Sequence, residues 1–196
     1  MKKGILIPIT TIVVAALVLV GANLGLRGVA HKNAQEKHVW LMQTILPDSE
    51  NFVKEEYTGE DTNIRSVHKA ENGYVVETVV YGYAGDITMM VGVSNEGRVT
   101  GLVVTDMSET FSLGAQALTD HVFLAQFLNQ SGDMAISTGT DAFSGATQST
   151  DTEYSTYVDG ITGATVTSKA IAKSVNSAVA FVTGADIETG ATSWGG

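Results

Sequence analysis

The sequence predicts an α+β protein: a single N-terminal transmembrane helix, then a domain with an antiparallel meander sheet and packed helices. Between residues 63 and 106, short runs rich in Val, Tyr and Thr are separated by Asn-Gly and Glu-Gly turn signals, the pattern of strands joined by hairpins. Between residues 168 and 182, apolar residues recur three and four positions apart, which predicts a helix. Strands followed by separate helices indicate α+β instead of alternating α/β.

The first thirty residues predict a membrane anchor. After Lys2 and Lys3, an apolar stretch covers residues 4–26. As a helix, about 23 residues span roughly 34 Å, enough for the hydrocarbon layer of a bilayer. The apolar region of a secretory signal peptide has only about 7–15 residues. We therefore expect a single-pass anchor over residues 1–30, and a signal peptide cleaved after Ala30 is the alternative.

The charge distribution predicts the side of the membrane on which the domain lies. The chain has 11 basic and 21 acidic residues, and the first acidic residue is Glu36. Acidic residues impose little penalty on translocation, so we expect a cytoplasmic N-terminus in the cell membrane and an extracytoplasmic domain over residues 31–184. Residues 185–196 have no pattern and read as a tail. Such an acidic surface argues against nucleic acid as a partner.

Turn and periodicity signals place the remaining elements along the chain. A helix after the anchor ends at Pro47, which cannot continue it. Asn72-Gly73 and Glu96-Gly97 mark hairpins between strands rich in Val. The expected elements are a helix over residues 33–46, strands over 63–70, 74–81, 86–94 and 99–106, a helix over 119–129, a loop over 130–158 and a helix over 168–182.

Composition excludes several kinds of chemistry. The sequence has no cysteine, which rules out disulfides, thiolate zinc sites and iron–sulfur clusters held by cysteine. The four histidines show no metal-ligand spacing, so no metal site is expected. No nucleophile-elbow or phosphate-loop sequence occurs, and no catalytic acid, base or nucleophile is predicted. Redox chemistry in this chain would therefore need an organic cofactor.

The most informative stretch is the Gly-Ala-Thr motif, residues 159–167, with the sequence Asp-Gly-Ile-Thr-Gly-Ala-Thr-Val-Thr. Its small residues let a ligand approach the backbone, and Gly163 tolerates a positive φ. The helix that follows offers unpaired N–H groups and the positive end of its dipole, which predicts a phosphate site with Lys169 in its first turn. In the alternative interpretation, Thr165 or Thr167 caps the helix and Gly163 only makes a turn.

The motif resembles that of covalently flavinylated FMN-binding domains: Asp, two variable residues, Ser or Thr, Gly, Ala, Ser or Thr, a variable residue, and Ser or Thr. The resemblance implies one FMN, whose phosphate is esterified by the Thr167 hydroxyl. It also implies a separate flavin transferase that takes FMN from FAD and recognises Asp159. The other cofactor-binding residues that it implies in the motif are Thr162, Gly163, Ala164, Thr165 and Lys169.

The resemblance continues outside the motif. Residues 82–93 and 97–101 look like the family's core hairpin, and residues 108–115 are similar to its Ser-Glu-Thr-Pro-Gly-Leu-Gly-Ala loop, with Phe111-Ser112 in place of Pro-Gly. This loop implies further cofactor-binding residues: Glu109, Thr110, Leu113 and Gly114.

With its anchor, the chain most resembles the G subunits of Rnf complexes, which are ion-translocating ferredoxin:NAD oxidoreductases. This resemblance implies a membrane-anchored electron-transfer subunit whose partners are the other subunits of the complex. One alternative is the C subunit of the sodium-pumping NADH:quinone reductase, which shares the motif. The other is a membrane-anchored scaffold protein without redox chemistry.

A second copy of the motif pattern covers residues 141–149 and ends at Ser149. The residues after it do not begin a helix with an apolar face, so a phosphate there would lack the helix dipole. We expect Thr167 to be the single attachment site and residues 141–158 to be an insertion with a degenerate copy. The alternatives are attachment at Ser149 and attachment at both residues.

Overall fold

The computed structural model describes residues 15–18, 20–21, 32–108, 113–137 and 156–185. The chain divides into two units, Met1–Trp40 and Leu41–Gly196. In the first unit, residues 15–18, 20–21 and 32–40 are helical, and in the second unit residues 41–45 are helical. Among the described residues, no helix combines the length and the apolar character needed to cross a membrane. Most of the predicted anchor, residues 1–30, lies outside the described residues.

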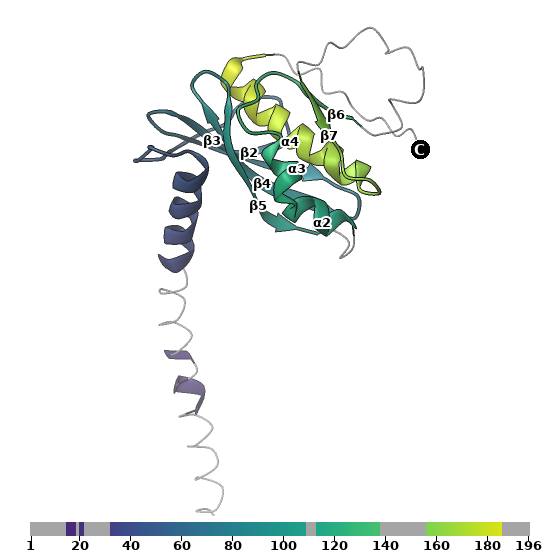
Figure 1. Ribbon diagram of the computed structural model, residues 1–196. Helices are drawn as coiled ribbons and strands as arrows, with labels where there is room; N and C mark the ends of the chain where they lie inside the picture. Colours follow the sequence, from purple (N-terminus) through teal and green to yellow (C-terminus); the bar gives the residue numbers. More distant parts are fainter. Residues whose placement is uncertain (1–14, 19, 22–31, 109–112, 138–155, 186–196) are drawn as a thin grey trace, which may run out of the picture. The chain divides into compact units, whose positions relative to one another are not determined.

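Five strands form one antiparallel sheet in the order β1-β2-β3-β4-β5 (Figure 1). Each strand pairs with its neighbour in the sequence, so the predicted meander is confirmed. The bounds are Val53–Glu55 for β1, Ile64–Lys69 for β2, Gly73–Tyr81 for β3, Asp86–Ser94 for β4 and Val99–Met107 for β5. The four predicted strands agree with β2 to β5 to within one residue at each end. The three-residue β1 was not predicted because it is too short to show a period.

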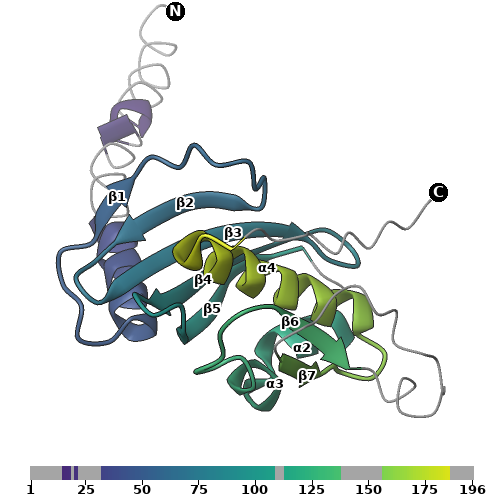
Figure 2. The ribbon, with the colours of Figure 1, turned by 90° about the horizontal axis from the view of Figure 1, so that it is seen from above.

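Helix α4, Thr165–Thr183, covers one face of this sheet (Figures 1 and 2). The pleat sends alternate residues to opposite faces, so Val76 of β3 packs in the core on the α4 side, while the adjacent Val75 belongs to a second cluster. The α4 side holds most of the hydrophobic core: Val76, Val80, Ile87, Met89 and Val91 from the sheet, and Ile171, Val175, Ala178 and Val179 from α4.

The end of the helix over residues 32–45 packs on the opposite face, where Met42, Ile45 and Leu46 form a buried cluster with Ala70, Val75 and Met90. Two glycines make room for it. Gly92 and Gly101 lie opposite each other on β4 and β5. A Cβ at Gly92 would lie 2.4 Å from the Ile45 carbonyl oxygen, and one at Gly101 would lie 2.7 Å from the Ile45 Cα. The Thr100 hydroxyl donates to the same carbonyl at 2.6 Å.

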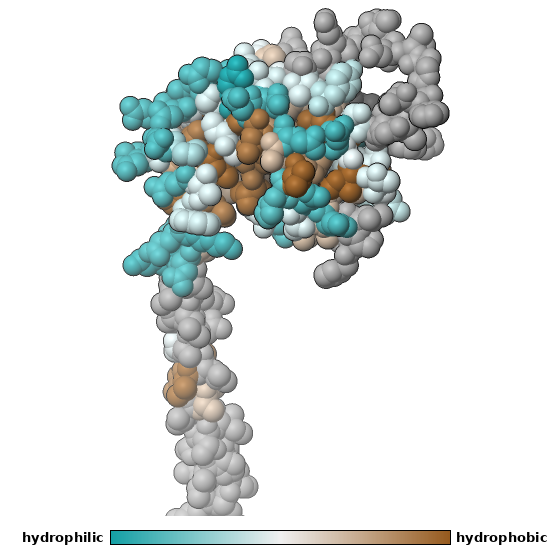
Figure 3. All heavy atoms as spheres, in the orientation of Figure 1, coloured by the Kyte–Doolittle hydropathy of each residue, from teal (hydrophilic) through white to brown (hydrophobic). Residues whose placement is uncertain are grey.

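The chain between the sheet and α4 differs from the prediction. The helix expected over residues 119–129 occurs in a shorter form, as α3 (His121–Ala125). A second short helix, α2 (Leu113–Thr119), precedes it and was not predicted. Asp120 separates them because its carboxylate accepts from the N–H groups of Val122 (2.9 Å) and Phe123 (3.1 Å), which makes it the N-cap of α3. Hydrophobic side chains lie among hydrophilic ones over the face that carries these helices (Figure 3).

The predicted loop over residues 130–158 is wrong over residues 134–137 and 156–158, which are strands. β6 (Met134–Ser137) and β7 (Thr156–Asp159) form a two-stranded parallel pair. The side-chain amide of Asn176 on α4 holds β6, since it accepts from the Met134 N–H and donates to the Met134 carbonyl, each at 3.0 Å. Strands of four residues that pair at long range leave little local signal in a sequence.

We predict that Gly101→Ala destabilises the domain by about 1–3 kcal/mol, because the added methyl group meets the Ile45 backbone and forces it away from the sheet. Thermal unfolding of the chain and limited proteolysis around residue 45 would measure the effect. Thr100→Val serves as a milder comparison, since it removes only the hydrogen bond to Ile45. An unchanged melting temperature and cleavage pattern for Gly101→Ala would contradict the packing described above.

Candidate functional site

The Gly-Ala-Thr motif connects the end of β7 to the start of α4. The N–H of Ala164 donates to the carbonyl of Ile161 at 2.9 Å, which closes a tight turn. Gly163 lies inside this turn with a φ of 82°, a conformation that glycine adopts without steric cost. Gly163 thus uses the positive φ that glycine tolerates, and the turn redirects the chain from the strand into the helix.

The first three N–H groups of the motif each bind a different element. The Asp159 N–H donates to the side-chain oxygen of Gln126 at 2.9 Å, and Gln126 is the C-cap of α3. The next N–H, of Gly160, donates to the Ser137 carbonyl of β6 at 2.9 Å. The third, of Ile161, donates to Oγ of Ser168 on α4 at 3.2 Å. Residues 159–161 are thereby tied to the surrounding fold.

Helix α4 begins earlier than predicted, at Thr165 instead of residue 168. Its N-cap is Ala164, which has no side-chain oxygen, and the cap has no side-chain hydrogen bond. The alternative in which Thr165 or Thr167 caps the helix is therefore wrong, because both threonines lie within the first turn. The N–H groups of Thr165 and Val166 have no intrahelical acceptor at this end of a helix. The first turn contains no acidic residue that would compensate the helix dipole.

Thr167 lies on the inner side of this first turn, with only 1% of its surface exposed. Thr162, Gly163 and Lys169 are exposed. Lys169 follows Thr167 by two residues, which is about 200° around a helix, so the two side chains leave opposite sides of α4. The structure therefore does not bring Lys169 to Thr167. The side chain of Asp159, at the end of β7, is exposed as well.

The second group of predicted residues lies at the start of α2. Glu109 and Thr110 fall outside the described residues, as does Ser149 of the second motif copy. Leu113 is the first residue of α2 and Gly114 is buried in it. Helix α2 contacts both α4 and β5, so the structure brings this element to the helix that carries the motif.

The hairpin between β3 and β4 contacts Ser108, which begins the loop over residues 108–115. The Ser108 N–H donates to the Asp86 carbonyl at 2.9 Å. A Cβ at Gly85 would lie 2.8 Å from Cβ of Ser108, so only glycine fits there without movement. The two segments whose sequences resemble the family outside the motif are therefore neighbours in the fold.

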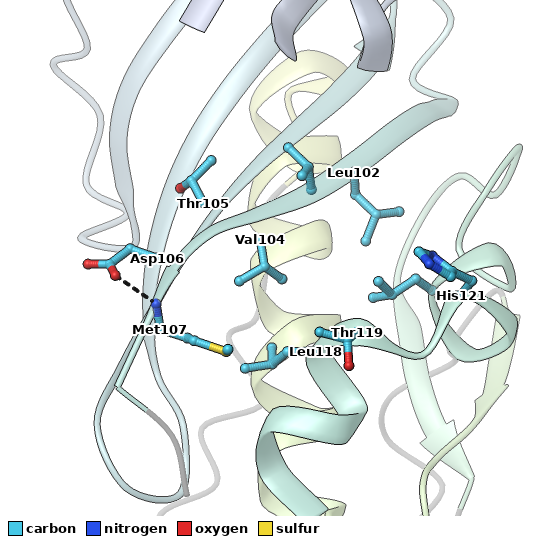
Figure 4. A pocket seen from close by; sticks show the side chains of 10 residues that line it. Leu102, Val104, Thr105, Asp106, Met107, Leu118, Thr119 and His121 are labelled. Atoms are coloured by element: carbon cyan, nitrogen blue, oxygen red, sulfur yellow. Dashed lines mark hydrogen bonds between the residues drawn. The ribbon is translucent and has the colours of Figure 1, made fainter. Parts of the chain in front are cut away.

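A groove of about 620 Å³ lies beside β5, between this strand and the helices α2 and α3 (Figure 4). It is lined mainly by aliphatic side chains, including Leu102, Val104, Leu118 and Leu124, with His121 at its α3 side. None of the predicted site residues lines it. The motif, and not this groove, therefore defines the candidate site. Among the described residues, no group of three or more His, Asp or Glu side chains is arranged to hold a metal ion.

Three residues that were not predicted as site residues hold the motif: Gln126, Ser137 and Ser168. The sequence analysis assigned no role to them. Ser168 follows Thr167 directly, so its position next to the motif was the available signal. Gln126 precedes Asp159 by 33 residues and lies in a segment predicted as part of one continuous helix, and nothing in the sequence connects the two.

The family described as FMN-binding domain matches residues 82–180 of the chain. This region begins at the β3–β4 hairpin and includes the motif and most of α4.

Two curated relatives are each 33% identical over 110 residues. One is the G subunit of the Na(+)-translocating ferredoxin:NAD(+) oxidoreductase complex of Acetobacterium woodii, with 55% of this chain and 47% of the relative covered. The other is the G subunit of the proton-translocating ferredoxin:NAD(+) oxidoreductase complex of Clostridium ljungdahlii, with 56% and 53% covered. The chain thus spans about half the length of these relatives.

A solved structure with a similar arrangement is that of the C subunit of the Na(+)-translocating NADH-quinone reductase from Parabacteroides distasonis. It is 20% identical with a TM-score of 0.46, over 67% of this chain and 74% of that one.

We predict that Ser168→Ala lowers the free energy of unfolding by about 1–3 kcal/mol, because the Ile161 N–H loses its acceptor next to a side chain that is fully buried. Chemical denaturation measures this loss, and amide exchange at Ile161 should accelerate at the same time. Lys173→Ala, an exposed change on the same helix, should stay within about 0.5 kcal/mol of wild type. Equal stability of the two variants would show that the Ser168 bond does not hold the motif.

Proposed function

Because this chain belongs to the FMN-binding domain family, we propose that it carries one FMN on Thr167 and transfers electrons through it. The observation that carries this proposal is the geometry of the motif: a turn at Gly163, then a helix whose N-terminus has neither a side-chain cap nor an acidic residue. A helix start of this kind favours a phosphate. FMN, once bound, would supply the redox chemistry.

The residues present fit the phosphate end of FMN. The N–H groups of Thr165 and Val166 are not used within α4, and the exposed Gly163 leaves the adjacent backbone open to a ligand. Ala164 has no larger side chain that would cover these groups. The phosphate would lie against backbone donors, whereas Lys169, on the opposite side of the helix from Thr167, would contribute only at longer range.

Attachment would form a bond between the Thr167 hydroxyl oxygen and the flavin-side phosphorus of FAD. The pyrophosphate P–O bond would break, AMP would leave, and the hydroxyl proton would pass to a base of the flavin transferase. No oxidant or reductant is needed. Because Thr167 is almost fully buried, neighbouring parts of the chain must move aside while the transferase acts and must leave room for the attached phosphate afterwards. The modified side chain would then carry a flavin that never dissociates, at a constant distance from other carriers.

The two relatives named as G subunits support a place in a multisubunit ferredoxin:NAD(+) oxidoreductase that translocates ions. In this proposal, residues 1–30 anchor the chain in the cell membrane with a cytoplasmic N-terminus. Residues 31–184 form the extracytoplasmic flavin domain and residues 185–196 a tail. The partners are the other subunits of the complex, because a single tethered flavin needs a donor and an acceptor.

We predict that Thr167→Ala abolishes covalent flavin in protein produced together with the transferase, because the accepting hydroxyl is gone. Thr167→Ser should retain attachment, since it keeps the hydroxyl, and Ser149→Ala should load like wild type. Intact-protein mass spectrometry detects one FMN less one water, and in-gel fluorescence checks it.

Two results would contradict this assignment. Loss of flavin from Ser149→Ala, with Thr167→Ala still loaded, would move the site to the second motif copy. Wild-type protein that gains no mass in the presence of the transferase would indicate a scaffold without a flavin.

A further inference from the structure

We propose that the start of α4 over residues 163–168, the first-turn segment, opens as a unit to expose Thr167 for flavin attachment, and that Ser168 controls how often it opens. This inference rests on the proposed function, because it concerns the residue that would carry FMN. It starts from the burial of that residue: only 1% of the surface of Thr167 is exposed, so part of the fold must move before its hydroxyl can react.

The first-turn segment contributes little to the hydrophobic core. Val166 is its only large apolar side chain, and 39% of the Val166 surface is exposed. The buried residues of the segment, Ala164, Thr167 and Ser168, have small side chains. One turn further on, Ile171 is fully buried in the core. Segments with little buried apolar surface open at a lower free energy than the whole domain, so the start of α4 can open while the rest of the helix stays packed.

The chain on both sides of the first-turn segment is held in place. Before it, the side-chain amide of Gln126 binds the backbone N–H and carbonyl of Asp159, at 2.9 and 3.2 Å. After it, the Ser174 hydroxyl bonds to the hydroxyl of Thr78 on β3, and both side chains are fully buried. Gly163, which is exposed and has a φ of 82°, provides a flexible point between these two attachments. The attachments confine the motion to a short stretch of chain.

Ser168 joins the first-turn segment to the chain that precedes it. Its Oγ accepts from the Ile161 N–H at 3.2 Å, and its own N–H donates to the Ala164 carbonyl at 2.8 Å. The second of these is the first intrahelical bond of α4, because Ala164 is the N-cap. A Cβ at Gly160 would lie 3.7 Å from Cβ of Ser168, so the two residues are in close contact. Opening of the segment would break both bonds of Ser168 together.

The N-cap itself offers little resistance to opening. Ala164 makes no side-chain hydrogen bond, and a helix end without such a bond is less stable than a capped one. The bond between Ile161 and Ser168 is therefore the side-chain contact that opposes opening. If the elements that cover Thr167 moved instead, this bond would have no influence on how often Thr167 is exposed. The two possibilities can be separated by experiment.

The test uses the absence of cysteine from the chain. Thr167→Cys places a single thiol at the buried position, and its rate of reaction with a soluble maleimide measures opening. It should react about tenfold or more slowly than Val166→Cys, at the 39% exposed position of the same turn, because reaction requires opening. Ser168→Ala, added to Thr167→Cys, should raise the rate about tenfold, the effect of losing one buried hydrogen bond.

Ser174→Ala, also added to Thr167→Cys, is the matched control. It removes a hydroxyl from another fully buried serine, about two turns further along α4. It should lower the thermal midpoint but leave the reaction rate within about twofold, because the local opening does not involve that bond. An equal increase in both variants would mean that the thiol reacts through global unfolding. No increase in Ser168→Ala would mean that another part of the chain moves. Either result would overturn the inference.

Initial rates of flavin attachment, with purified transferase and FAD, connect the opening to the modification. Ser168→Ala should raise the rate about tenfold over wild type, whereas Ser174→Ala should not. If Ser168→Ala gains flavin at the wild-type rate despite faster thiol reaction, opening does not control attachment and the inference is wrong, while the proposed function stands. A wild-type chain that gains no flavin would refute the proposed function and the role of opening in attachment. The thiol reaction, which needs no flavin, would still show whether the segment opens.

Discussion

Helix α4 rests on the sheet through a surface that combines apolar packing with buried hydrogen bonds. The Thr78 and Ser174 hydroxyls bond to each other, and the Asn63 amide donates to Oγ of Ser177 at 3.3 Å. Apolar packing is not directional and would allow α4 to slide or rotate, whereas buried polar groups tolerate only the arrangement in which their partners meet. These bonds therefore set the rotation of α4, and with it the side of the first turn from which Thr167 projects.

The segments around the motif depend on that placement. Asn176 binds β6 to α4, β6 pairs with β7, and β7 leads into the motif. Helix α4 follows the motif directly. Through β6, it also holds β7, the strand that precedes the motif. Such a closed arrangement fixes the position of the motif relative to the sheet. The exposed Asp159 lies at its outer border.

On the opposite face of the sheet, a helix packs partly against strand backbone. There the end of the helix over residues 32–45 meets the backbone at Gly92 and Gly101, and the contact is close because both residues lack a side chain. Both glycines were visible in the sequence as parts of the hairpin that resembles the family. Their role in helix packing could not be predicted, because the sequence of a strand does not show which distant helix will pack against it.

The sequence by itself determined the antiparallel meander and the position of the motif before a helix, because hairpin turns and the helical period are local features. It also led to the family, since the motif is contiguous. Tertiary structure alone decided the parallel pairing of β6 and β7 and the burial of Thr167, because both depend on residues far apart in the chain. The break between α2 and α3 is local, since Asp120 caps α3 through N–H groups two and three residues further on.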